Sequence, residues 1–503
     1  MTRKRWCRQF ESKEVLVEVY VNRDLLKEAL QYRRSGGEMR PLKLLLLVCV
    51  LVSFIYPGEP KKEAPLYGLY TWGNELNKNL ELIKDTGFRI ICMPLDESDT
   101  EKGYKCAVKN NIEVAGMLVC NGFVNKNMDL KGWRELVNKS LRRFGPNGSF
   151  WAENKDLPPR PVRFYIIGGE PGTELKPPGE MMPDEAYYLM LKAASEEIRG
   201  YDKAAKIVAM SPIGAFSGAL SRDTVNTKQK IMGPYAFIRG VHKYGGAALY
   251  DCIDVHPFTH PMPPDVGGVQ EIFKWLKEET KKNGGEKPIW CTEMGFPLSY
   301  GMANPFFFTK DQAADNFVRF LALCARHGVQ TVTLTYPEDQ YSVSGRYKGY
   351  GIYSLNGKMR VAAKAIKLMT DLLPDPELLS VISDGQTPNP EPVKCSYEPY
   401  KDSPYFCYKF KGRNNSEVII AWTSGKPFSY EIEGLKEKNV VLYNRELLGG
   451  VVCAVKDNKI KIPISNVPIF ISNEVTDQLI KNTENYLKVG KDIKWAPIYG
   501  AED

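Results

Sequence analysis

The stretch FYIIGGEPGTE, residues 164–174, places a short apolar run directly before two glycines, a glutamate and a proline. Residues 164–167 are apolar and β-prone, which is typical of a buried strand, and the glycines end it. Glu170 is therefore expected at the carboxyl end of a strand. A lone Glu-Pro pair is more often a solvated loop residue than a reactive one. Its interpretation depends on a second carboxylate in the same setting.

The strand at residues 164–167 belongs to a repeated pattern of strands and helices between residues 65 and 375. We expect strands at residues 67–72, 88–94, 112–120, 162–167, 206–211, 251–256, 288–292 and 329–336. We expect helices at residues 75–87, 101–111, 130–144, 182–200, 231–244, 267–285, 310–327 and 358–372. Eight such pairs over roughly 300 residues predict an α/β protein with a (β/α)8 TIM barrel. The alternative, a doubly wound sheet, usually has a glycine-rich loop after its first strand, and LYTWGNE is not one.

The pattern changes after residue 375. Short alternating runs such as PYFCYKFKG and SEVIIAWTS, separated by Gly, Asn or Pro, fill residues 376–475 and predict a small all-β sandwich. Residues 476–503 are expected to form a loosely attached tail.

Composition is that of a globular chain. Of 503 residues, 43% are hydrophobic and 25% charged, and the formal net charge is +8. Lys and Arg are dispersed among Asp and Glu, which argues against a nucleic-acid partner. The eleven cysteines form no CxxC motif, and their spacing does not match that of a zinc-binding site. No cofactor is indicated, and the sequence leaves the oligomeric state open.

Residues 1–64 form an N-terminal extension with an export signal. The apolar run at residues 44–56 follows Arg40 and Lys43, and it is shorter than the roughly twenty residues that span a membrane. We therefore expect a signal peptide and a secreted or extracytoplasmic protein. Because no A-x-A cleavage site is visible, an uncleaved membrane anchor is the alternative. Translation from Met39 instead of Met1 also stays open.

The second carboxylate is Glu293. In a TIM barrel, reactive groups stand at the carboxyl ends of the strands. Glu170 ends the fourth predicted strand, and Glu293, in KPIWCTEMGFP, ends the seventh. His256 ends the sixth, Tyr336 the eighth and Trp72 the first.

Two glutamates at one barrel mouth fit the cleavage of glycosidic bonds. One carboxyl group protonates the leaving oxygen, and the other attacks or stabilises the anomeric carbon. Trp72, Tyr336 and His256 are the expected substrate-binding residues, and the expected partner is a carbohydrate. A metal site at His256 and His260 is not expected, because the prolines of HPFTHP prevent a helix and a third ligand is missing.

Residues 65–473 resemble the clan A glycoside hydrolases, and most closely the xylosidase/iduronidase-like enzymes with a C-terminal β-sandwich. Glu170-Pro171 matches the Asn-Glu-Pro motif of the acid/base, and TEMG with Glu293 matches the nucleophile motif. The segment DVHPF at residues 254–258 matches a D-x-H-P-[FY] motif of the sixth strand, and residues 350–369 resemble the stretch before the last barrel helix. The resemblance implies a retaining mechanism.

This chain departs from the clan at three positions. Gly169 replaces the asparagine before the acid/base, Cys92-Met93-Pro94 stands where an arginine ends the second strand, and Tyr336 replaces a tryptophan. Gly169 and the missing arginine favour the alternative of a non-catalytic carbohydrate-binding barrel. A surface scaffold whose sandwich binds other proteins is a third interpretation. Glu174, Glu338 and Asp339 are expected to be solvated loop acids.

Overall fold

The computed structural model describes residues 4–6, 17–19, 64–119, 128–171, 183–213, 225–226, 231–260, 262–298, 308–341, 347–385 and 405–488. The chain divides into two compact units, Met1–Glu63 and Ala64–Asp503. In the first unit, the described residues are an antiparallel pair of strands, β1 (Lys4–Trp6) and β2 (Val17–Val19). The apolar run at residues 44–56 lies outside the described residues.

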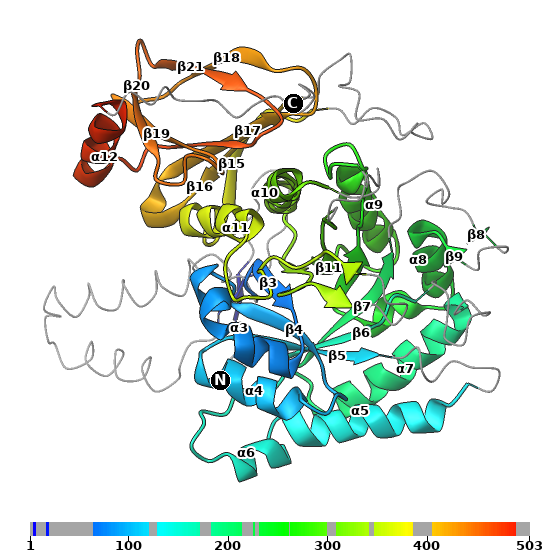
Figure 1. Ribbon diagram of the computed structural model, residues 1–503. Coiled ribbons are helices and arrows are strands. Elements are labelled where there is room, and N and C mark those ends of the chain that lie inside the picture. The colour runs from blue at the N-terminus through cyan, green and yellow to red at the C-terminus, as the bar shows by residue number, and fades with distance from the viewer. Residues whose placement is uncertain are drawn as a thin grey trace, which may run out of the picture. The chain divides into compact units, whose positions relative to one another are not determined.

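Eight parallel strands close into a barrel in the second unit (Figure 1). Around the barrel they follow the order β10-β11-β12-β3-β4-β5-β6-β7, so strands that are consecutive in the repeat are neighbours. The strands are β3 (Tyr67–Tyr70), β4 (Ile90–Pro94), β5 (Glu113–Val119), β6 (Phe164–Gly168), β7 (Lys206–Ile213), β10 (Cys252–His256), β11 (Ile289–Met294) and β12 (Thr331–Leu334). The closed sheet confirms the predicted TIM barrel.

A helix follows each barrel strand. These helices are α3 (Gly73–Asp85), α4 (Thr100–Lys109), α5 (Leu130–Phe144), α7 (Asp184–Tyr201), α8 (Pro234–Lys243), α9 (Val269–Lys282), α10 (Lys310–Arg326) and α11 (Val361–Leu372). Shorter elements of the barrel are α6 (Ser149–Glu153), η2 (Gly246–Leu249), β8 (Val225–Asn226), β9 (Ile231–Met232), β13 (Gln340–Tyr341) and β14 (Tyr347–Lys348).

Helix α5 illustrates how the sequence sets these elements. Its apolar residues recur every three or four positions, so Trp133, Val137 and Leu141 are buried against the barrel while charged residues face outward. The Asp129 side chain accepts a hydrogen bond from the Gly132 amide and caps the first turn.

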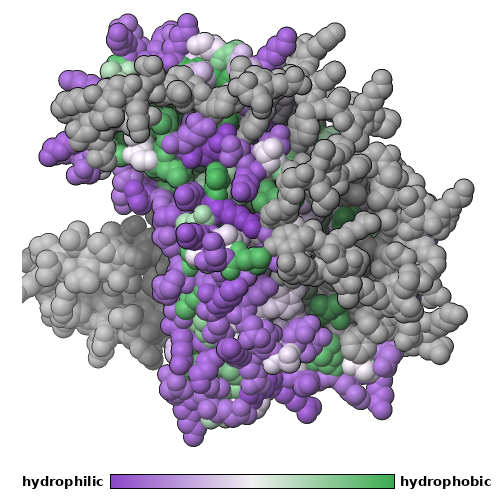
Figure 2. All heavy atoms as spheres, in the orientation of Figure 1, coloured by the Kyte–Doolittle hydropathy of each residue, from purple (hydrophilic) through white to green (hydrophobic). Residues whose placement is uncertain are grey.

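In Figure 2, the face that carries α4 and α6 is mostly hydrophilic.

Side chains fill the interior of the barrel. The rings of Phe164 on β6 and Trp290 on β11 lie 4.9 Å apart, and Cys92 on β4 is fully buried in the same cluster. Because the interior is packed, reactive groups can meet a ligand only at the mouth of the barrel.

The antiparallel strands after the barrel confirm the predicted sandwich. Its larger sheet has the order β15-β16-β17-β22-β19-β20, and β18 pairs with β21 in a second sheet. The strands are β15 (Glu377–Ser383), β16 (Tyr405–Lys411), β17 (Glu417–Thr423), β18 (Phe428–Glu433), β19 (Asn439–Tyr443), β20 (Val451–Ala454), β21 (Lys459–Ile464) and β22 (Ile469–Ser472), with a short helical turn, η3 (Arg413–Asn415). Ile419, Ile432 and Ile462 belong to the apolar core of this sandwich.

The start of the predicted tail forms a helix, α12 (Asp477–Lys488). The hydroxyl of Thr483 accepts a 2.8 Å hydrogen bond from the amide of Val452 on β20, so this helix contacts the sandwich. The remaining tail residues lie outside the described residues.

A buried ion pair within the barrel is hydrogen-bonded to the sandwich. Asp265, which follows β10, accepts hydrogen bonds from Arg319 on α10 at 3.3 Å and from the indole of Trp422 on β17 at 3.1 Å, and also from Ser424. The side chains of Asp265 and Arg319 are 0% and 4% exposed. Removing either charge would leave the other buried without its partner.

The seven described cysteines are all free, and six of them are buried. Cys92, Cys252 and Cys291 lie within barrel strands, as small buried hydrophobic residues are expected to do. Within the described ranges, no helix is both long and apolar enough to cross a membrane.

Candidate active site

The first predicted glutamate lies where β6 ends. The backbone of Gly169 has a φ of +108° and that of Glu170 a φ of +56°, so two successive residues are left-handed. A φ of +108° is open mainly to glycine, so Gly169 is required by the turn that directs Glu170. At Gly168, a Cβ atom would lie 2.7 Å from the hydroxyl oxygen of Ser211, which explains the second glycine.

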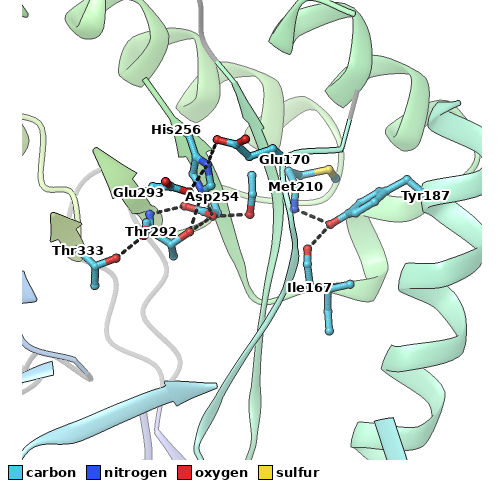
Figure 3. Close-up of polar contacts among 10 residues, drawn as sticks. Ile167, Glu170, Tyr187, Met210, Asp254, His256, Thr292, Glu293 and Thr333 are labelled. Carbon is cyan, nitrogen blue, oxygen red and sulfur yellow. Dashed lines mark hydrogen bonds and ion pairs between the residues drawn. The ribbon is translucent and has the colours of Figure 1, made fainter. Parts of the chain in front are cut away.

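The second predicted glutamate lies at the end of β11, in the same mouth of the barrel (Figure 3). A carboxylate oxygen of Glu170, one of Glu293 and a ring nitrogen of His256 all lie within 4.8 Å of one another. The Glu170 side chain is 30% exposed and that of Glu293 is 15% exposed. Both carboxylates are thus mostly buried but keep some exposed surface.

His256 lies between the two glutamates at the end of β10. Its Nδ1 is 3.1 Å from Glu170 Oε1 and 3.6 Å from Glu293 Oε2. Burial alone would lower the pKa of His256, but hydrogen bonds to Asp254 and Glu170 and the charge of Glu293 raise it to about 10. The two carboxylates, which would otherwise repel each other, thus favour a proton on the imidazole between them.

Asp254 supports the opposite side of the imidazole. It is fully buried on β10, two residues before His256, so both side chains point to the same face of the strand. Its carboxylate accepts hydrogen bonds from the Ser211 hydroxyl and from both the amide (2.8 Å) and the hydroxyl of Thr292. His256 Nε2 lies 2.9 Å from the Thr292 hydroxyl and 3.5 Å from Asp254 Oδ2.

Tyr187 on α7 fixes the strand ends that carry this network. Its hydroxyl donates to the carbonyl of Ile167 on β6 at 2.6 Å and accepts from the amide of Met210 on β7 at 2.7 Å (Figure 3). Met210 and Ser211 both have positive φ, +98° and +49°, and the pairing of β7 with β10 shifts register beyond this point. The irregularity turns Ser211 toward Asp254.

Aromatic rings form one wall beside the carboxylates. The hydroxyl of Tyr336 donates to Glu293 Oε1 at 2.8 Å, and burial together with the charge of Glu293 raises the pKa of Tyr336. The Tyr336 ring lies 5.3 Å from that of Trp72, 5.7 Å from that of Tyr70 and 6.4 Å from that of Tyr350. Such rings suit the apolar faces of a sugar.

The structure therefore brings all five predicted site residues to one mouth, and it adds others. Sequence reasoning missed Tyr70, Ser211 and Tyr350, and it placed Asp254 and Thr292 in motifs without giving them a role in the site. The alternation along a strand could have identified Asp254, because it precedes His256 by two. Ser211 had no such signal, because only the irregular end of β7 turns it inward.

The expectation that Glu338 and Asp339 are solvated is wrong. Both are only 6% exposed. Lys78 contacts Glu338 at 2.6 Å, and Arg360 forms a two-pronged ion pair with Asp339. These two ion pairs link the turn after β12 to α3 and to the start of α11. They thereby fix the segment that carries Tyr336. Glu174 lies outside the described residues.

The structure shows what occupies the place of the arginine that clan A enzymes have at the end of the second strand. Cys92 points into the packed barrel, where burial raises the pKa of its thiol. Arg89 lies at the other end of β4 and pairs with Asp375 at 2.8 Å, so it does not replace the missing arginine. A basic group next to Glu293 is instead His256, whose Nδ1 lies 3.6 Å from Oε2 of that glutamate.

Glu170, His256 and Glu293 are also the described side chains grouped closely enough to hold a metal ion. One imidazole and two carboxylates are suitable zinc ligands, and Asp254 beyond the ring is a common second partner in such sites. However, a raised pKa at His256 opposes metal binding, because a metal requires the deprotonated nitrogen. The absence of a metal stays a prediction.

No family model matches the chain, and no curated protein matches its sequence. Several solved structures of similar fold are glycoside hydrolases. A glucosidase from Croceicoccus marinus superposes with a TM-score of 0.54 at 11% identity, over 79% of this chain and 92% of that one. The family 51 α-L-arabinofuranosidase AbfB from Bifidobacterium longum gives 0.53 at 11% identity, over 83% and 97%. CelM2, a bifunctional glucanase-xylanase from a metagenome library, gives 0.51 at 10% identity, over 81% and 96%. This chain therefore has a glycoside hydrolase-like fold, a TIM barrel followed by a β-sandwich.

Proposed function

We propose that this protein is a retaining glycoside hydrolase in which Glu170 is the general acid/base and Glu293 the nucleophile. The observation that carries the proposal is the pair of carboxylates that β6 and β11 deliver to one mouth, with oxygens within 4.8 Å of each other. Retaining enzymes separate the two groups by about 5 Å, whereas inverting enzymes need about 6.5–9.5 Å to admit a water molecule.

The surroundings of each glutamate support its assigned role. Glu293 receives a hydrogen bond from Tyr336 and faces His256, so the anionic form required for attack is stabilised. Glu170 has twice the exposure of Glu293, which suits a group that must reach the leaving oxygen and later an incoming water. In the first step, Glu170 gives its proton to the leaving oxygen while Glu293 bonds to the anomeric carbon. In the second, water displaces Glu293 and returns a proton to Glu170.

A screen of aryl glycosides and oligosaccharides tests this function. We expect hydrolysis of at least one class, with the anomeric configuration of the first product, read by proton NMR, equal to that of the substrate. Glu293→Ala should abolish turnover, and azide should partly restore it by attacking the anomeric carbon from the vacated space. Inversion of configuration, or full activity of Glu293→Ala, would refute the assignment.

A non-catalytic carbohydrate-binding protein is the second candidate. Gly169 favours it, because this residue cannot supply the side-chain hydrogen bond to the sugar 2-hydroxyl that strengthens at the transition state. In that case, oligosaccharides should bind to wild type and to Glu170→Ala and Glu293→Ala with equal affinity by calorimetry, without turnover. Loss of turnover in the variants with retained binding would instead support the enzyme.

Two finer assignments accompany the main proposal. The order of the motifs at Glu170, residues 254–258 and Glu293 supports a relationship to the xylosidase/iduronidase-like branch of clan A. The apolar run at residues 44–56 supports export, with retention as a membrane anchor as the alternative. N-terminal sequencing of protein from the culture medium and from membranes distinguishes the two.

A further inference from the structure

The hydrogen-bonding capacity of Thr292 determines where one proton of His256 must lie. A threonine hydroxyl has a single hydrogen, and Thr292 donates it to Asp254 Oδ2. Its oxygen can then only accept. Because His256 Nε2 lies 2.9 Å from that oxygen, Nε2 must carry a hydrogen and donate it.

Asp254 enforces this arrangement. Three donors converge on its buried carboxylate, namely the Ser211 hydroxyl and the amide and hydroxyl of Thr292. With the Thr292 hydrogen committed to Asp254, the threonine cannot turn it toward the ring. The tautomer with a hydrogen only on Nδ1 would place a bare Nε2 against the Thr292 oxygen, so it is disfavoured.

The other ring nitrogen has a different kind of partner. Nδ1 faces two carboxylates, Glu170 at 3.1 Å and Glu293 at 3.6 Å. A hydrogen bond at the shorter distance requires one proton between Nδ1 and Glu170 Oε1, on either atom. The pair is therefore a protonated imidazole beside a carboxylate, or a neutral imidazole that accepts from a carboxylic acid.

We propose that Glu170 and His256 form one proton-holding pair, in which Asp254, acting through the Thr292 hydroxyl, keeps Nε2 protonated and leaves Nδ1 to exchange a proton with Glu170. Asp254, Thr292 and His256 are positioning residues, since they act through Glu170. The catalytic consequence rests on the proposed glycosidase function, whereas the proton arrangement can be measured without it.

The proton balance is closed within the proposed reaction. At the start the pair holds one exchangeable proton, which moves from Nδ1 to Glu170 and from there to the leaving oxygen as the carbon–oxygen bond breaks. His256 is then neutral with Nε2 protonated, and Glu170 is a carboxylate. When water attacks the glycosyl-enzyme, its proton returns to Glu170 and is again shared with Nδ1, while the bond to Glu293 breaks.

Three carboxylates and one phenol surround the ring. Glu170 faces His256 from the end of β6, Glu293 from β11 and Asp254 from β10, and Tyr336 reaches it through Glu293. A charge on the imidazole is balanced by these carboxylates.

The tautomer can be measured directly, because the chain has only four histidines. In full-length protein with 15N-labelled histidine, we expect the long-range 15N–1H spectrum to show His256 with Nε2 protonated from pH 6 to 11 and with titration confined to Nδ1. His256→Gln assigns the signals by their disappearance. A neutral His256 with hydrogen on Nδ1 and none on Nε2 would overturn the proposal.

Variants then test the role of Asp254. In Asp254→Asn, the new amide donates to the Thr292 oxygen and frees the threonine hydrogen for Nε2, so the neutral ring should change to the Nδ1-protonated tautomer. If that variant does not fold, Thr292→Val should shift the tautomer in the same direction, and Thr292→Ser should restore it. The matched control is Thr333→Val, since the Thr333 hydroxyl donates to the Thr292 carbonyl and not to the ring. An unchanged tautomer in folded Asp254→Asn or Thr292→Val would refute the role of Asp254.

Kinetics distinguish this inference from the proposed function. With a hydrolysed substrate, Asp254→Asn should lower kcat/KM about a hundredfold for poor leaving groups and much less for activated aryl glycosides, because only the former need the acid. It should also move the alkaline limb of the pH profile to lower pH. An inactive wild type with the expected spectrum would refute the glycosidase but support the proton arrangement. An active wild type, together with an unchanged spectrum in Asp254→Asn, would support the glycosidase but refute the proton arrangement.

Discussion

The charge on His256 predicts a specific dependence of stability on pH. The pKa of His256 rises from 6.5 to about 10 in the folded protein. A group whose pKa is raised by folding contributes stability that is present below its unfolded pKa and is lost as pH rises through its folded pKa. The relevant window for His256 therefore runs from pH 6.5 to about 10.

The size of this contribution follows from the same values. At about 1.36 kcal/mol per pH unit, a rise from 6.5 to about 10 corresponds to roughly 5 kcal/mol. His256→Gln has no charge to lose. The difference in the free energy of unfolding between wild type and this variant should therefore shrink by up to about 5 kcal/mol between pH 6.5 and 10. Titrating groups that do not interact with His256 are common to both proteins and cancel, whereas the carboxylates around the ring titrate together with it.

Urea unfolding followed by tryptophan fluorescence at pH 6.5, 8 and 9.5 measures this difference. His242→Gln is the matched control, because burial lowers the pKa of His242 and places its titration below the window. Its difference from wild type should be constant above pH 7. If the His256→Gln difference is equally constant, His256 is neutral in the folded protein and the charge arrangement around Glu293 is wrong.

Three further predictions concern the acid, the metal and the domain junction. Glu170→Ala should slow substrates with poor leaving groups by about 10²–10⁴-fold in kcat while activated aryl glycosides react more nearly normally, as measured by a leaving-group series. Dialysis against a chelator should leave hydrolysis unchanged, and a loss restored by zinc would instead assign Glu170 and Glu293 as metal ligands. Asp265→Ala should lower the free energy of unfolding by about 3–5 kcal/mol, because it leaves Arg319 buried without this carboxylate. Urea unfolding measures this loss, and the control variant Ser424→Ala, which removes only one hydrogen bond to Asp265, should lose about 1 kcal/mol.

The alternation of strands and helices predicted the fold well, because each strand and helix of a βα unit is set by the pattern of apolar residues within its own short segment. The barrel strand containing residues 164–167 was expected at residues 162–167 and is found at Phe164–Gly168. Glu170 and Glu293 could be predicted because position at a strand end is readable from sequence. Helix α8 begins at Pro234 rather than residue 231, because Ile231–Met232 pairs as β9 and proline suits the first helical position.

The supporting network was less accessible from sequence. Ser211 and Asp254 meet across two strands only because β7 is irregular at Met210, and such an irregularity has no clear signature here. Glu338 and Asp339 follow a strand in a polar segment that is typical of an exposed loop. Their burial depends on Lys78 and Arg360, which are distant in sequence, so local pattern could not predict it.

Covalent trapping of the nucleophile tests the central claim most directly. Incubation with a panel of 2-deoxy-2-fluoro glycosides, which slow the second step more than the first, should leave a glycosyl adduct that peptide mass spectrometry locates on Glu293. The adduct should be absent from Glu293→Gln and should persist in Glu170→Ala when an activated leaving group is used. An adduct on another residue, or hydrolysis of glycosides with inversion and without any adduct, would contradict the assignment of Glu170 and Glu293 as the retaining pair.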